Sequence, residues 1–325
     1  MSKPTLIMTS VMLDQLGVSV DDAFNVVRIR DLEGQADEMA AVANDVTAIT
    51  TGGHGVYVDG AFMDRFPNLK VIANFGVGYD GIDTTAAHER RVIVTNTPDV
   101  LTEEVADTTL GLLLMTVREL GAAERYLRAG KWSEEGEYPL TDMSLRDRSI
   151  GIVGLGRIGN AIAKRCAAFG LPISYFSRSE KPGNTYTYYS SLKDMAAATD
   201  TLIVITPGTP ETKNLINADV LKALGPNGVV INVARGSVVD ETALIAALKD
   251  GTIKAAGLDV MWNEPHIDPE LMTLDNCVLL PHVGSASKHT RNGMAQLVVD
   301  NMLAMKSGTP PKTPVPETPF TNWKS

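Results

Sequence analysis

A glycine-rich stretch at residues 149–165 restricts the possible folds of this chain more than any other segment. Residues 150–153 are an apolar run typical of a buried strand, and an alanine-rich helical pattern follows the glycines. Gly154, Gly156 and Gly159 stand at G-x-G-x-x-G spacing between the two. Such spacing also occurs in ordinary turns, but here the strand and helix stand where a dinucleotide pyrophosphate needs them. The expected cofactor contacts of this turn are Gly154, Leu155, Gly156, Arg157, Ile158 and Gly159.

The composition is that of an ordinary globular protein with enough residues for two domains. The chain has 325 residues, of which 44% are hydrophobic and 21% charged, and its net charge is −10. It has no dense Lys/Arg tract, no signal-peptide pattern and no apolar run near the roughly 20 residues of a membrane span. We therefore expect a cytoplasmic protein with no nucleic-acid or membrane partner. Cys166 and Cys277 stand in apolar contexts, which favours buried thiols over a disulfide.

The first hundred residues alternate short apolar runs with amphipathic segments. This alternation predicts a parallel, doubly wound α/β sheet. The expected strands are 5–8, 48–50, 71–74 and 92–95, and the expected helices are 37–44, 61–66 and 84–90.

A second glycine-containing segment, residues 74–80, directly follows one of these strands. Gly76 and Gly78 flank Val77, so successive backbone N–H groups could face a small anion such as a carboxylate. An ordinary glycine-rich turn explains the same residues equally well.

A break at residues 97–99 precedes a long helical pattern that starts near Thr102, and we expect this helix to lead into a second domain. Residues 130–145 are then polar and irregular and contain Trp132 and Tyr138. These aromatic residues would either serve an oligomer interface or pack onto their own domain.

The strand after the glycine turn, residues 171–176, ends in Ser177, Arg178 and Ser179. An NAD site usually carries an Asp or Glu at this place, whereas here Glu180 comes a few residues late. A guanidinium between two hydroxyls suits a 2′-phosphate, so the sequence favours NADP over NAD.

Further buried strands are expected at 201–206, 229–233, 255–260 and 278–280, with helices at 217–224 and 241–249. Each strand ends in polar or conformationally special residues, and a doubly wound sheet assembles its site from such ends. These residues include Thr206, Pro207, Ala234, Arg235, Asp259, His282 and Gly284. A helix over 287–305 and an extended, proline-rich tail from Thr309 are expected to complete the chain.

Three residues near these strand ends suit the chemistry of hydride transfer. Arg235 could bind a carboxylate through two parallel hydrogen bonds, and His282 could give a proton to a carbonyl oxygen. Glu264 could orient the imidazole and stabilise its charged form. Taken singly, each residue also has a structural explanation, as a surface ion pair, a packed histidine or the start of a turn. No metal site is expected, since His54, His88, His266 and His289 lack metal-ligand spacing.

Four sequence blocks, taken together, resemble those of one enzyme family. The blocks are GLGRIG at 154–159, NVARG at 232–236, GLDV through Glu264-Pro265, and LPHVG at 280–284. In order and spacing they resemble the D-isomer-specific 2-hydroxyacid dehydrogenases over nearly the whole chain. Within that family the chain is most similar to glyoxylate/hydroxypyruvate reductases. Residues 175–179 resemble the NADPH-preferring members and plant hydroxyphenylpyruvate reductases.

The resemblance implies roles for individual residues. Arg235 would bind substrate, His282 would be the general acid/base, and Glu264 would be its partner. Val77 and Gly78 would hold the substrate carboxylate through their N–H groups. The further cofactor contacts expected at strand ends are Thr206, Pro207, Val233, Ala234, Asp259 and Gly284.

The resemblance also implies a Rossmann cofactor domain, residues 102–287, inserted in a flavodoxin-like substrate domain formed by 1–101 and 288–325. These domains would close over the substrate, and the protein would be a homodimer. The expected activity is NADPH-dependent reduction of hydroxypyruvate and glyoxylate to D-2-hydroxy acids.

The sequence also suggests three alternatives to this activity. A larger acid, such as hydroxyphenylpyruvate or 2-ketogluconate, stays open because Met261 and Trp262 would either narrow the substrate pocket or extend from a partner subunit. A cofactor-sensing corepressor also stays open, since such relatives keep the same three residues. A formate dehydrogenase is disfavoured because those enzymes have Gln where Glu264 stands.

Overall fold

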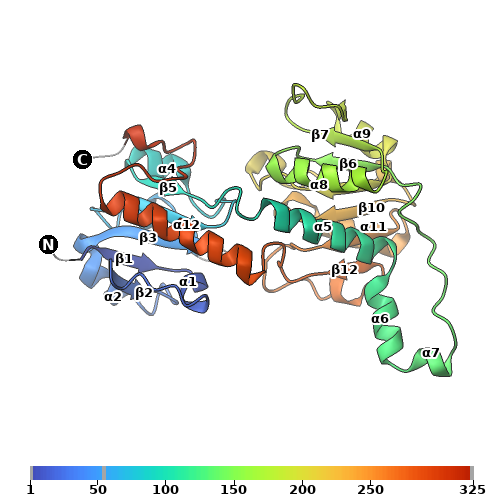
Figure 1. Cartoon of the computed structure of the whole chain (residues 1–325), viewed down its shortest axis with the longest axis horizontal. Helices are drawn as coiled ribbons and strands as arrows, with labels where there is room; N and C mark the ends of the chain where they lie inside the picture. The colour runs from blue at the N-terminus through green and yellow to red at the C-terminus, as the bar shows by residue number, and fades with distance from the viewer. Residues whose placement is uncertain (1–2, 53–55, 323–325) are drawn as a thin grey trace. The chain divides into compact units, whose positions relative to one another are not determined.

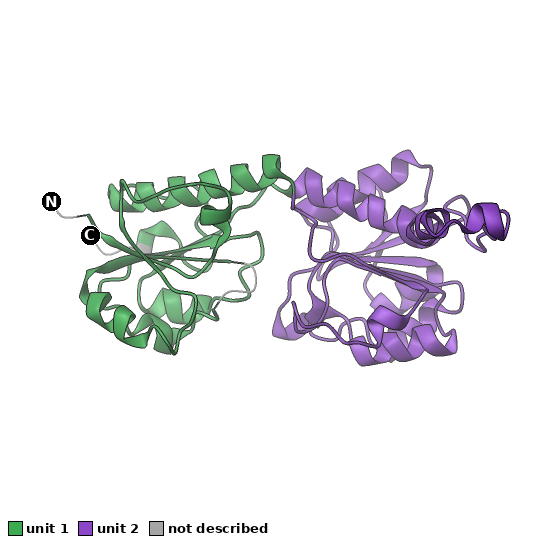
Figure 2. Cartoon of the chain, turned by 90° about the horizontal axis from the view of Figure 1, so that it is seen from below, with its two compact units in different colours: residues 1–101, 287–325 green, residues 102–286 purple. Residues whose placement is uncertain are grey.

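The computed structural model describes residues 3–52 and 56–322, and the chain divides into two compact units (Figure 2). Unit 1 consists of Met1–Leu101 and Ser287–Ser325, and unit 2 consists of Thr102–Ala286. Unit 2 is therefore an insertion in unit 1. Each unit buries its own apolar core around a parallel sheet.

Unit 1 contains a five-stranded sheet in the order β2-β1-β3-β4-β5 (Figure 1). All neighbouring strands are parallel, and this is the flavodoxin-like strand order, so the predicted doubly wound fold is confirmed. The strands are β1 (Thr5–Met8), β2 (Asn25–Arg28), β3 (Val46–Gly52), β4 (Val71–Phe75) and β5 (Ile93–Thr95). The helices are α1 (Met12–Gln15), α2 (Ala36–Val42), α3 (Gly60–Met63), α4 (Thr84–Glu89) and α12 (Lys288–Lys306).

Unit 2 contains a seven-stranded parallel sheet in the order β12-β11-β10-β9-β6-β7-β8. The order reverses between β6 and β9, which is the Rossmann arrangement and confirms the predicted cofactor-binding fold. The strands are β6 (Ile150–Val153), β7 (Ile173–Phe176), β8 (Thr187–Tyr189), β9 (Thr201–Val204), β10 (Val229–Asn232), β11 (Ala255–Leu258) and β12 (Cys277–Leu279). The helices are α5 (Thr102–Val117), α6 (Leu120–Arg128), α7 (Lys131–Glu134), α8 (Arg157–Ala168), α9 (Leu192–Ala198), α10 (Ala218–Leu224) and α11 (Glu241–Asp250).

Two strands, β2 and β8, were not predicted from the sequence. Both lie at the edge of their sheet and pair with one neighbour only. Their side chains are half-buried or exposed, so neither segment has the continuous apolar run that marks the central strands.

The C-terminal segment returns along unit 1 after α12. Ser287 caps α12 by accepting a hydrogen bond from Thr290 N at 3.1 Å. Beyond the helix, Pro314 forms an antiparallel bridge with Thr95 of β5, so the proline-rich tail is an extended strap as predicted. Among the helices formed by the described residues, none is both long enough and apolar enough to cross a membrane.

Candidate active site

The glycine turn between β6 and α8 has the conformation that its spacing predicts. Gly154 has a φ of +104°, and a Cβ there would lie 3.0 Å from the carbonyl oxygen of Ile205. A Cβ at Gly159 would lie 2.2 Å from the carbonyl oxygen of Gly154, so this glycine lets α8 pack against the turn. Neither position has room for a larger residue.

Gly156 differs from the other two glycines, because a Cβ there would meet nothing within 4 Å. It is the N-cap of the 12-residue helix α8 and supplies no capping side chain. The N–H groups of the first turn are therefore left to an external acceptor. The open space and these donors fit the pyrophosphate of a dinucleotide.

The loop after β7 carries the residues expected to select the cofactor. Arg178, Ser179 and Glu180 are exposed, and the hydroxyl of Ser177 donates to the carbonyl of Ser179 at 2.6 Å. On the loop after β9, the pKa of Glu211 is lowered mainly by a hydrogen bond from Thr209 and also by the positive charge of Arg178. A cationic, solvent-accessible loop fits a 2′-phosphate.

The turn after β10 holds Arg235 and is shaped by Asn232. The Asn232 side chain, 1% exposed, accepts from Ala234 N at 3.1 Å and donates to Arg235 O at 3.0 Å. A Cβ at Gly208 would lie 2.9 Å from Arg235 Cγ, so the loop after β9 packs closely against this side chain. Arg235 Nη1 donates to Ala234 O at 2.7 Å. The guanidinium is thus held at the carboxyl edge of the sheet.

Glu264 and His282 are in direct contact. Glu264 Oε2 lies 2.7 Å from His282 Nδ1, and because a carboxylate only accepts hydrogen bonds, the ring nitrogen is the donor. The other carboxylate oxygen, Oε1, accepts from Met261 N at 2.8 Å. The side chain of Glu264 is 11% exposed and that of His282 is 39% exposed, so the ring can reach a ligand while its partner stays buried. This pair suits general acid/base chemistry at Nε2.

Asp259 fixes the backbone around His282, whose φ is +52°. The Asp259 carboxylate accepts hydrogen bonds from Val283 N at 2.7 Å and Gly284 N at 2.8 Å. The backbone carbonyl of Asp259 accepts from His282 N at 2.9 Å. Burial raises the pKa of Asp259, while these two N–H groups and the nearby His282 oppose that rise. The raised pKa therefore results from desolvation.

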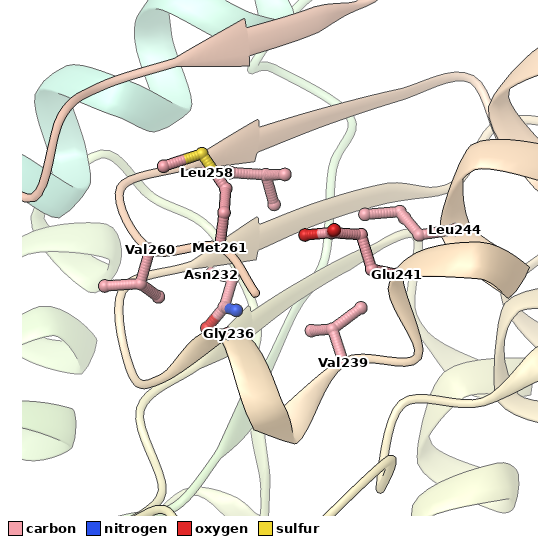
Figure 3. Close-up of a pocket in the computed structure, with 8 residues that line it drawn as sticks. All are labelled: Asn232, Gly236, Val239, Glu241, Leu244, Leu258, Val260 and Met261. Carbon is pink, nitrogen blue, oxygen red and sulfur yellow. The ribbon is translucent and has the colours of Figure 1, made fainter. Parts of the chain in front are cut away.

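Glu241, at the start of α11, provides a second anchor for the loop that carries Glu264. Glu241 Oε2 accepts from Trp262 N at 2.9 Å, and the Trp262 indole donates to Val239 O at 2.7 Å. Figure 3 shows Glu241 and Met261 on the wall of a small cavity. Burial raises the pKa of Glu241, and the N–H of Trp262 opposes the rise. Met261 and Trp262 are thus tied to their own unit.

The remaining residues predicted to contact the cofactor follow the strand ends of unit 2. Because the strands are parallel, these ends share one edge of the sheet with the glycine turn. Thr206 and Pro207 follow β9, and the Thr206 backbone lies against Gly154. Val233 and Ala234 follow β10 and are 7% and 4% exposed, so they offer mainly backbone at this edge.

Val77 and Gly78 lie in unit 1, in the loop after β4. Asn74 Nδ2 donates to the carbonyls of Gly76 at 3.0 Å and Gly78 at 2.9 Å. Asn96 Nδ2 donates to the Val77 carbonyl at 2.9 Å. The N–H groups of Val77 and Gly78 donate to no other residue in the described part of the chain. This loop therefore has three anchored carbonyls and two amides available to an anion.

Four residues that hold these turns and loops were not predicted from the sequence: Asn74, Asn96, Asn232 and Glu241. Asn74 and Asn232 each interrupt an apolar strand run just before a turn, and that position was a usable signal. No local sequence pattern indicates the roles of Asn96 and Glu241, because their hydrogen-bond partners, Val77 and Trp262, lie 19 and 21 positions away in the sequence.

Within residues 3–52 and 56–322, no group of three or more His, Cys, Asp or Glu side chains is placed to hold a metal ion. His54 lies outside the described residues.

Comparison with known proteins connects this geometry to a family. Residues 110–284 match the family described as D-isomer specific 2-hydroxyacid dehydrogenase, NAD binding domain. Hydroxyphenylpyruvate reductase of Plectranthus scutellarioides is 44% identical over 310 residues, which cover 95% of this chain and 98% of that protein. Glyoxylate/hydroxypyruvate reductase A of Arabidopsis thaliana is 43% identical over 310 residues, with the same coverage of 95% and 98%.

A solved structure agrees with this relationship. The NADPH-dependent glyoxylate/hydroxypyruvate reductase of Sinorhizobium meliloti, crystallised with NADP and malonate, is 49% identical and superposes with a TM-score of 0.93. The match covers 100% of this chain and 99% of that one. The glycine turn, the parallel sheets and these matches together show that the chain belongs to the D-isomer-specific 2-hydroxyacid dehydrogenase family.

Proposed function

We propose that this protein reduces small 2-keto acids, first hydroxypyruvate and glyoxylate, to D-2-hydroxy acids with NADPH. The observation that carries the proposal is the 2.7 Å contact between Glu264 and His282, at the sheet edge that also bears the glycine turn. The reductases similar to this chain support the substrate class.

The proposed mechanism assigns one task to each residue. The nicotinamide supplies the hydride when the cofactor is bound. His282 Nε2 gives a proton to the carbonyl oxygen, while Glu264 holds Nδ1 and stabilises the charged ring. Arg235 pairs with the substrate through charge-assisted hydrogen bonds. The amides of Val77 and Gly78 receive the substrate carboxylate.

The preference for NADPH over NADH rests on Arg178. The loop after β7 places no carboxylate at the strand end, and the exposed guanidinium would attract a 2′-phosphate. The similar Sinorhizobium structure contains NADP. Arg157, which opens α8, would instead lie near the pyrophosphate of the cofactor.

A steady-state assay tests this function. Purified protein is given NADPH, and separately NADH, with glyoxylate, hydroxypyruvate, hydroxyphenylpyruvate and 2-ketogluconate. We expect rapid, NADPH-selective turnover of the two small acids. In His282→Ala, kcat should fall about 10²- to 10⁴-fold while NADPH still binds, because the general acid is lost. Unchanged turnover in this variant would exclude the acid/base role. NADPH binding by the wild type without turnover of any of the four acids would instead favour a cofactor-sensing protein.

A larger substrate is the second candidate, favoured by the 44% identity to a hydroxyphenylpyruvate reductase. The same assay decides between the two. Turnover confined to hydroxyphenylpyruvate or 2-ketogluconate would keep the mechanism and change the substrate.

We also infer a homodimer and a cytoplasmic location. Trp132 and Leu127, on the segment formed by α6 and α7, are 60% and 55% exposed and would be covered by a second copy. Tyr138 instead packs within unit 2, with its ring 5.4 Å from that of Tyr126 and its hydroxyl on Glu119. The two cysteines are free thiols, which suits a reducing compartment.

A further inference from the structure

Residues 313–318, here called the C-terminal strap, are anchored in unit 1 by two buried residues although part of the segment is exposed. Val315 and Thr318 are each 1% exposed. Val315 N donates to Val94 O at 2.9 Å, and Val94 N donates to Thr318 Oγ1 at 2.9 Å. In Figure 1 this red segment runs beside α4 and β5. The strap therefore has a defined place beside β5.

One end of the strap holds Asn96. Thr313 Oγ1 donates to Asn96 O at 2.7 Å and accepts from Asn301 Nδ2 at 2.8 Å, and Asn301 is fully buried in α12. Asn96 in turn donates to the Val77 carbonyl at 2.9 Å. A continuous set of hydrogen bonds thus runs from α12 through the strap to the middle of the loop.

The other end of the strap holds Tyr79, the residue after Gly78. The Tyr79 hydroxyl donates to Glu317 Oε2 at 3.1 Å and Oε1 at 3.3 Å. The backbone carbonyl of Glu317 lies 2.8 Å from His88 Nδ1 of α4, which fixes this part of the strap. Burial, together with Glu317, raises the pKa of Tyr79 to about 12, so the hydroxyl stays protonated and remains a donor at neutral pH.

The peptide geometry of the loop explains why these contacts matter for ligand binding. In a trans peptide the C=O of one residue and the N–H of the next point in opposite directions. The Val77 carbonyl points to Asn96, so the Gly78 N–H points away from it. The Gly76 carbonyl points to Asn74 and Thr97 N, so the Val77 N–H points away from them. Anchoring the carbonyls therefore aims both amides.

We propose that the C-terminal strap positions this loop for carboxylate binding, with Thr313 acting through Asn96 and Glu317 acting through Tyr79. These four are positioning residues, since none is assigned a contact with the reacting atoms. The inference rests on the proposed function, in which Val77 and Gly78 receive the substrate carboxylate. It adds that residues more than 200 positions away determine affinity for that group.

The test separates binding of the carboxylate from general stability. Tyr79→Phe removes the hydroxyl that bonds Glu317 and keeps the ring. Thr313→Val removes the hydrogen bond from Thr313 Oγ1 to Asn96 O. Glu317→Ala removes the acceptor of the Tyr79 hydroxyl, whereas Glu317→Gln can still accept a hydrogen bond. Lys312→Ala is the matched control, because Lys312 bonds Asp300 beside the strap and does not touch the loop. KM and kcat for glyoxylate, the inhibition constant of malonate, NADPH affinity and Tm are measured for each variant.

We expect KM and the malonate inhibition constant to rise together by about two- to tenfold in Tyr79→Phe, Thr313→Val and Glu317→Ala, the range expected for one lost hydrogen bond. kcat and NADPH affinity should stay within about twofold, and Glu317→Gln and Lys312→Ala should bind both acids like the wild type. The double variant Tyr79→Phe/Glu317→Ala should raise KM and the malonate inhibition constant no more than either single change, since both changes remove the same Tyr79–Glu317 contact.

Unchanged KM and malonate inhibition in Tyr79→Phe and Thr313→Val, whatever their Tm, would overturn the inference and leave the strap as a purely stabilising element. Failure of the proposed function is distinct, because the wild-type protein itself would then turn over neither small acid with NADPH.

Discussion

Buried asparagine side chains set the backbone geometry of both candidate binding regions. Asn232 is 1% exposed and Asn74 is 4% exposed. A buried amide must find hydrogen-bond partners, and the nearest ones are the backbone groups of the turn that follows. Each asparagine therefore fixes a turn, the one that carries Arg235 or the one that carries Val77.

Arg178 gives the residue-scale prediction. In Arg178→Ala we expect kcat/KM with NADPH to fall about tenfold or more, because charge-assisted hydrogen bonds to the 2′-phosphate are lost. kcat/KM with NADH should stay within about twofold, since NADH lacks that phosphate. Lys193→Ala, which removes an exposed cation of α9, is the control and should change neither value. An equal loss with both cofactors would mean that Arg178 supports the loop and does not select the cofactor.

Among the elements of unit 2, α8 depends for its position on the missing side chain at Gly159. The helix packs on α5 and starts at the glycine turn. Its third residue, Gly159, lies so close to the Gly154 carbonyl that no Cβ fits. Close approach of this helix to the strand brings its N-terminal N–H groups to the sheet edge.

Gly159→Ala tests this packing. Alanine favours a helix over glycine by about 1 kcal/mol, but here its Cβ would meet backbone, which cannot move aside cheaply. We expect the steric effect to win, with a net loss of about 1–3 kcal/mol in the free energy of unfolding and weaker NADPH binding. Gly111→Ala in α5 is the matched control, because a Cβ there meets nothing within 4 Å. It should raise stability by about 0.5–1 kcal/mol in denaturant unfolding. Equal stabilisation of both variants would contradict the packing argument.

At the scale of the whole molecule, the chain forms two parallel-sheet units with one inserted in the other. The carbonyl-anchored loop lies in unit 1, and the glycine turn with Arg235, Glu264 and His282 lies in unit 2. The proposed reaction therefore draws on both units, while each set of residues is held by contacts within its own unit.

The proposed dimer gives a prediction at this scale. Trp132→Glu places a charge on the exposed apolar surface of α7, and we expect it to shift the protein from dimer toward monomer in analytical ultracentrifugation. Met272→Glu is the control, since Met272 is 62% exposed but lies outside the α6–α7 segment, and it should remain dimeric. A wild-type monomer, or a Trp132→Glu dimer of unchanged affinity, would argue against this interface.

Local patterns account for the parts of the fold that the sequence predicted. The central strands could be predicted because they are buried on both faces and are therefore mostly apolar in sequence. The edge strands β2 and β8 were missed because half of their surface faces solvent. Chemistry and position near strand ends predict Glu264 and His282 as a pair, and in the structure their side chains are in contact.

The sequence by itself determined the strand, turn and helix around Gly154, Gly156 and Gly159, because glycine acts through the conformation of its own backbone. It also determined which side chains could do acid/base chemistry. Only the tertiary structure decided how these groups are held: Glu241 on the loop before Glu264, and the C-terminal strap on Asn96 and Tyr79. Thr318 and Val94 are 224 positions apart, and a hydrogen bond over such a separation leaves no periodicity in the sequence because only folding brings its two partners together.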